Sequence, residues 1–78
     1  MAIVMYSDEF RIYDFYDNDK YDNKDLEKLI EILKSFSLIT YEEIENRYPK
    51  FIRVKSIDNR SLYDVLFLIS TIFNFNVI

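Results

Sequence analysis

The feature that most constrains this chain is its longest apolar segment, residues 60–75, with the sequence RSLYDVLFLISTIFNF. Hydrophobic residues recur in it at spacings of three and four, which predicts an amphipathic helix with one continuous apolar side. The residues expected on that side are Leu62, Val65, Leu66, Ile69, Ile72 and Phe73. A membrane span needs about 20 apolar residues, so we interpret the segment as a core helix that most of the chain must cover.

Short strands are predicted on either side of a polar and helical middle. Aromatic and β-branched residues favour strands over 2–5, 10–16 and 51–56, with a last short strand over 76–78. A short polar turn joins the first strand to the second, which predicts a hairpin. Over 51–56 the alternation is clear, with Ile52 and Val54 on the side expected to be buried.

Two further helices are predicted between these strands. The first follows the polar turn at 17–23 and has a regular apolar stripe with charged residues opposite. The stripe consists of Leu26, Leu29, Ile30, Leu33 and Phe36. The second is short, over 41–47, because Thr40 and Glu43 have the spacing of a capping box and Pro49 ends the helical backbone.

The resulting order, β-β-α-(α)-β-α-(β), predicts an α+β fold. We expect a small two-layer sandwich in which two main helices cover one face of a mostly antiparallel sheet. The 78 residues leave room for a single domain, 1–78. A domain of this size is marginally stable alone, so contact with a second copy or a partner would add useful burial.

The residue types that are absent exclude the common small enzymes. The chain has no His, no Cys and no Gly, which removes the His-based triads, thiolate metal sites and glycine-rich phosphate loops. Residues 17–21 resemble the start of a calcium loop, but Asp22 and Lys28 stand where a glycine and a closing glutamate are needed. We therefore predict a protein without catalytic residues, cofactor or metal.

An acidic and aromatic segment is the first candidate for a working surface. Its carboxylates could imitate nucleic-acid phosphates and occupy a basic surface of another macromolecule, with tyrosines adding contact area. The predicted partner-binding residues are Asp14, Tyr16, Asp17, Asp19, Tyr21 and Asp22. This hypothesis describes an inhibitor or adaptor whose partner is another protein, itself nucleic-acid-binding, and whose origin is viral or a mobile element.

A basic stretch supports the alternative, a small dimeric regulator that binds nucleic acid. Phe51, Arg53 and Lys55 share one side of a predicted strand, where they could stack bases and neutralise phosphates. The residues proposed for this role are Arg47, Lys50, Arg53 and Lys55. The net charge of −4 argues against direct nucleic-acid binding.

The side of the 60–75 helix that faces away from the core is the third candidate. Helical spacing places large apolar residues there, which suggests a homodimer or partner contact. The residues of this predicted contact are Tyr63, Phe67, Leu68 and Asn74. A protein whose only role is assembly through this helix is a further alternative. The lack of cysteine and of a secretory signal favours a cytoplasmic protein without membrane contact.

Overall fold

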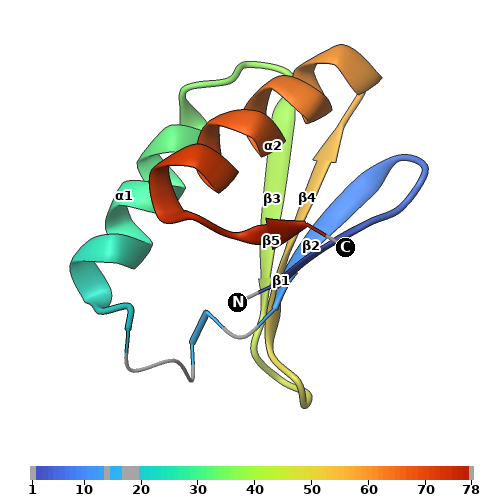
Figure 1. The fold of residues 1–78 in the computed structure, drawn as a ribbon. Coiled ribbons are helices and arrows are strands. Elements are labelled where there is room, and N and C mark those ends of the chain that lie inside the picture. Colours follow the sequence, from blue (N-terminus) through green and yellow to red (C-terminus); the bar gives the residue numbers. More distant parts are fainter. Residues whose placement is uncertain (1, 14, 17–19, 78) are drawn as a thin grey trace.

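Across residues 2–13, 15–16 and 20–77, which the structure describes, the computed structural model has a five-stranded sheet with two helices on one face (Figure 1). The elements are β1 (Ala2–Met5), β2 (Glu9–Tyr13), α1 (Asn23–Lys34), β3 (Ile39–Ile44), β4 (Phe51–Ser56), α2 (Asn59–Phe73) and β5 (Asn76–Val77). This arrangement confirms the predicted α+β class, with helices on one side of a mostly antiparallel sheet.

The strands lie in the order β3-β4-β2-β1-β5, antiparallel except for the parallel pair β1 and β5. Alternation along each strand decides which side chains face the helices. Ile12 pairs with both Ile3 and Ile52, and all three side chains are fully buried. Phe10 and Val54 form the next buried pair, so the buried side predicted for 51–56 is confirmed in β4.

Side-chain caps define where α1 and α2 begin. At α1 the Asp25 amide donates to Asp22 Oδ1 at 3.0 Å, and the Asp22 amide donates to Asp25 Oδ2 at 3.0 Å. At α2 the Asp58 carboxylate accepts a hydrogen bond from the amide of Ser61. The helix ends at Asn74, whose left-handed backbone (φ 57°) is the conformation that glycine usually supplies at this position.

Two of the sequence predictions are wrong. The short helix expected over 41–47 does not form: residues 41–44 belong to strand β3, which pairs with β4 from Ile39 opposite Ser56 to Ile44 opposite Phe51, and residues 45–47 follow it without helical structure. Its β-branched and aromatic residues suit a sheet, and pairing along the whole of β4 outweighs a local capping signal. Ile72, expected in the core stripe of α2, lies at its margin and is 41% exposed.

An aromatic cluster closes one end of the core. Phe15 stacks on Tyr21 with ring centroids 5.0 Å apart, and Phe73 stacks on Phe75 at 5.2 Å. The Tyr21 hydroxyl donates to the backbone carbonyl of Phe73 at 3.1 Å. These contacts fasten the segment between β2 and α1 to the end of α2. In the described part of the chain, neither helix combines the length and apolarity needed to cross a bilayer.

Candidate interaction surfaces

The described residues of the acidic segment are engaged within the fold. Tyr16, Tyr21 and Asp22 come together around a small hollow of about 70 Å³, while Asp14, Asp17 and Asp19 lie outside the described residues. Tyr21 belongs to the aromatic cluster, and Asp22 caps α1. Backbone N–H donors, first that of Asp25, lower the pKa of the Asp22 carboxyl.

Tyr16 connects this segment to the hairpin between β3 and β4. Its hydroxyl donates to Glu43 Oε1 at 2.8 Å, across a separation of 27 residues. Burial raises the pKa of the Tyr16 phenol, and the carboxylates of Glu43 and Glu45 raise it further. The structure therefore adds Glu43 and Glu45 to the acidic end of the molecule, although the sequence places them in a different segment.

The basic side chains of β4 lie on the open side of the sheet, but the aromatic ring of Phe51 beside them is covered. Phe51 is only 1% exposed. The guanidinium groups of Arg47 and Arg11 lie 4.8 and 4.9 Å from its ring centre, and the ring of Tyr13 lies at 5.2 Å. Phe51 therefore cannot stack on a nucleic-acid base unless these side chains move away.

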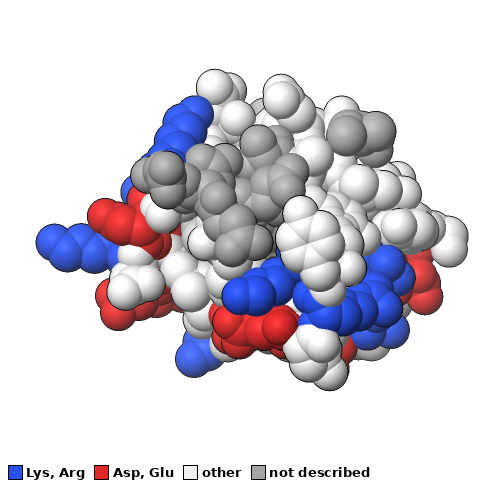
Figure 2. All heavy atoms as spheres, turned by 90° about the horizontal axis from the view of Figure 1, so that it is seen from below, with Lys and Arg blue, Asp and Glu red and all other residues white. Residues whose placement is uncertain are grey.

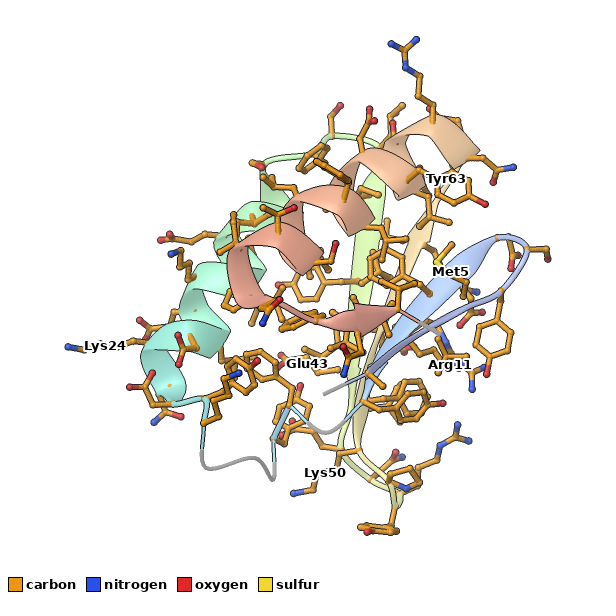
Figure 3. All side chains as sticks on the ribbon, viewed as in Figure 1. Met5, Arg11, Lys24, Glu43, Lys50 and Tyr63 are labelled. Carbon is orange, nitrogen blue, oxygen red and sulfur yellow. The ribbon has the colours of Figure 1, made fainter. Side chains whose placement is uncertain are left out.

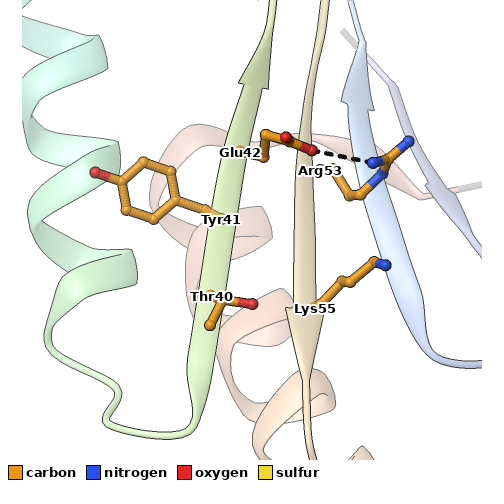
Figure 4. A pocket seen from close by; sticks show the side chains of 5 residues that line it. All are labelled: Thr40, Tyr41, Glu42, Arg53 and Lys55. Atoms are coloured by element: carbon orange, nitrogen blue, oxygen red, sulfur yellow. Dashed lines mark hydrogen bonds and ion pairs between the residues drawn. The ribbon is translucent and has the colours of Figure 1, made fainter.

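Two arginines of the open side, Arg11 and Arg53, are paired with carboxylates. Arg53 Nη1 donates to Glu42 Oε1 at 3.0 Å (Figure 4), and Arg53 Nε lies 3.2 Å from Glu9 Oε2. The second contact is within ion-pair distance but is not a hydrogen bond. Arg53 Nε has no hydrogen-bond partner among the described residues. Arg11 also bonds Glu9, at 3.0 Å, and its hydrogen bonds to Tyr13 and Glu9 raise the pKa of its guanidinium.

Lys55 is the exposed cation of this strand, opposite Thr40 on one side and Glu9 on the other. A shallow hollow of about 230 Å³ lies beside it, lined by Thr40, Tyr41, Glu42, Arg53 and Lys55 (Figure 4). At the lower end of the molecule, Figure 2 shows acidic and basic side chains next to each other. The predicted basic residues thus do not form a surface of a single sign.

The turn between β3 and β4 carries the most exposed aromatic residue of the described chain. Tyr48 is 89% exposed, between the exposed Arg47 and the half-buried Lys50. Figure 3 shows Lys50 at the lower end of the molecule, away from the start of α2. Tyr48 is accessible there, unlike Phe51.

An apolar groove follows the exposed side of α2. It has a volume of about 440 Å³ and is lined by Tyr63, Asp64, Leu66, Phe67, Ser70 and Val77. Phe67 is 74% exposed, Tyr63 58% and Val77 49%. Tyr63 lies on the upper turns of α2 in Figure 3. The sequence did not indicate Val77, because only the pairing of β5 with β1 brings it under α2.

The four residues of the predicted contact on α2 therefore do not lie together on one surface. Tyr63 and Phe67 lie together in the groove. Leu68 is 37% exposed and shares another flank of the helix with Ile72, four residues later. Asn74 is exposed and forms the end of the helix.

Among the described residues, no group of three or more Asp or Glu side chains is arranged to hold a metal ion. No protein-family model, no curated protein and no solved structure matches this chain.

Proposed function

We propose that this protein is a small non-catalytic interaction module, of the adaptor or inhibitor type, that binds an apolar helix of another protein chain through α2 and β5. The observation that carries the proposal is Phe67, a large apolar side chain 74% exposed at the edge of a groove. Large apolar residues that are exposed together mark contact surfaces more often than isolated ones do. Aromatic residues are also enriched in protein interfaces.

This proposal puts the contact on α2 and not on the acidic segment. Tyr16 and Tyr21 are half-buried and hydrogen-bonded inside the molecule, so they offer less area to a partner. Occupation of a basic, nucleic-acid-binding surface by Asp14, Asp17, Asp19 and Asp22 stays a prediction. A cytoplasmic location, favoured by the lack of cysteine, and a viral or mobile-element origin also stay predictions.

Displayed helical peptides provide the test. Peptides selected for binding would be purified and titrated against the wild type and Phe67→Asp. The control is Tyr48→Asp, the same kind of change at an exposed aromatic residue on the turn between β3 and β4. We expect Phe67→Asp to weaken binding about tenfold or more, because a charge in an apolar contact is desolvated without a partner. The proposal would be contradicted if the peptides bound the Phe67→Asp variant as tightly as the Tyr48→Asp variant.

Nucleic-acid binding through the tip of the β3–β4 turn is a second candidate function. Tyr48 is almost fully exposed and flanked by Arg47 and Lys50, a combination that can stack a base and contact phosphates. Fluorescence anisotropy with labelled single-stranded DNA and RNA at low salt would test it. We expect Tyr48→Ala to reduce any such affinity. An absence of binding at low salt removes this candidate, since phosphate attraction is strongest there.

A further inference from the structure

We infer that a second copy of this chain occupies the groove, forming a symmetric dimer in which the α2 helices pack antiparallel. The inference rests on the proposed function, because it names the helix that the groove receives. A symmetric interface requires that the same surface complement itself. The spacing, the charges and the exposed area of α2 each meet this requirement.

The spacing on the exposed side of α2 is that of a two-helix seam. The residues Arg60, Tyr63, Phe67, Ser70 and Asn74 repeat at alternating intervals of three and four, as at the contact positions of a heptad. An antiparallel pair centred on Phe67 places this ring against its equivalent in the second copy. Tyr63 then meets the small side chains of Ser70 and Thr71, so a large residue faces small ones on both sides of the two-fold axis.

The charges of α2 favour the antiparallel orientation. Arg60 lies in the first turn, where the positive end of the helix dipole disfavours a cation. All of α2 is described, and it has no acidic residue in the first turn and no basic residue in the last. In the antiparallel pair, Arg60 of each copy reaches the negative, carboxyl-terminal end of the other α2, near Asn74. Arg60 and Asp64 also balance each other, so this side carries no net charge into the contact.

The exposed area is sufficient for a weak dimer. With about 150–250 Å² per large aromatic side chain, the exposed parts of Tyr63, Phe67 and Val77 offer roughly 350 Å² of apolar surface per copy. Adding the polar residues of the seam brings the contact to about 600 Å² per copy, the lower end of specific interfaces. We therefore expect a dissociation constant of about 10–100 µM.

Sedimentation equilibrium or light scattering between about 5 and 500 µM protein, a range that brackets this constant, tests the inference. We expect the wild type and the control Tyr48→Asp to become dimeric at high concentration. Phe67→Asp should remain monomeric, and Arg60→Glu should weaken the dimer about threefold to tenfold, as expected for one charged contact. Far-UV circular dichroism checks that each variant is folded, and Arg60→Glu tests the same seam independently.

Cysteine cross-linking tests the orientation. Because the chain has no cysteine of its own, only the introduced cysteines can form a disulfide. A mixture of Arg60→Cys and Asn74→Cys proteins should form a mixed disulfide. Arg60→Cys alone should not cross-link, because its two copies lie about 20 Å apart along the helix axis at 1.5 Å per residue. Cross-linking of Arg60→Cys alone would overturn the antiparallel arrangement.

The outcomes separate this inference from the proposed function. A wild type that stays monomeric throughout, or a dimer unaffected by Phe67→Asp, overturns the second copy as the occupant. If helical peptides still bind in a manner that depends on Phe67, the proposed function stands with a different partner. If neither self-association nor peptide binding depends on Phe67, both the inference and the proposed function fail.

Discussion

The two phenylalanines at positions 15 and 67 offer a matched test of how the fold uses its aromatic residues. The ring of Phe15 is 3% exposed and lies 5.0 Å from Tyr21, 6.2 Å from Phe73 and 6.3 Å from Phe75, measured between ring centres. Truncation of a buried phenylalanine to alanine usually costs about 3–5 kcal/mol. A 78-residue domain has a total stability of roughly 4–12 kcal/mol. Phe15→Ala should therefore remove about a quarter of the stability or more.

Urea denaturation followed by circular dichroism at a few micromolar protein measures this loss. With a slope of about 1–1.5 kcal/mol per molar urea, we expect Phe15→Ala to lower the midpoint by about 2 M or more, or to unfold the protein without urea. Phe67→Ala is the same substitution at a 74% exposed site, and its effect should stay within about 0.5 kcal/mol. Equal losses in both variants would refute the assignment of Phe15 to the core and Phe67 to the surface.

Three further substitutions test single contacts by the same urea assay. Tyr21→Phe removes the hydrogen bond to the end of α2 and should cost about 0.5–1.5 kcal/mol; an unchanged midpoint would show that the bond contributes nothing. Asp22→Ala should lower the midpoint at pH 7. Since the fold lowers the Asp22 pKa, this carboxylate stabilises above the ordinary aspartate pKa of about 3.9. The effect should diminish as the pH falls below the ordinary value and through the lower folded one, whereas a difference that stays constant as the pH falls would contradict this cause. Glu9→Gln leaves two arginines facing each other across β2 and β4 and should cost about 1–2 kcal/mol; a neutral result would show that solvent already screens them.

The sequence was sufficient for the elements whose signals are local. Leu26, Leu29 and Leu33 of α1 and most of the predicted stripe of α2 follow a clear helical period and pack in the core. The strand β3 was missed because its decisive interaction is not local. Ile39 and Tyr41 turn toward the core only when the segment pairs with β4, and no property of residues 39–44 alone reveals that neighbour.

The predicted surfaces were incomplete for the same reason. Sequence proximity grouped Tyr16 with nearby aspartates, whereas the fold bonds it to Glu43, 27 residues away. Along the sequence Arg53 has the neighbours of a free cation, whereas in the fold it lies beside Glu9 and Glu42 from two other strands. Charges that seem separated along the chain neutralise one another across the sheet. Local charge counts therefore overestimate both the acidic and the basic surface.

The two exposed layers of this fold differ in how completely their apolar groups are covered. On the open side of the sheet, Phe51 lies beneath Arg11, Arg47 and Arg53, and two of these, Arg11 and Arg53, are bonded to carboxylates. Polar groups therefore cover the buried ring of Phe51, and this side gains little from another contact. On α2, Phe67 and Tyr63 have no such cover, although the same helix buries Leu62, Val65 and Ile69 on its inner side. Burial of apolar area is the main favourable term in association. The side of the molecule that leaves this term unused is α2, and a second α2 with reversed direction supplies both the apolar area and the cation, Arg60, that the carboxyl-terminal end of each helix lacks.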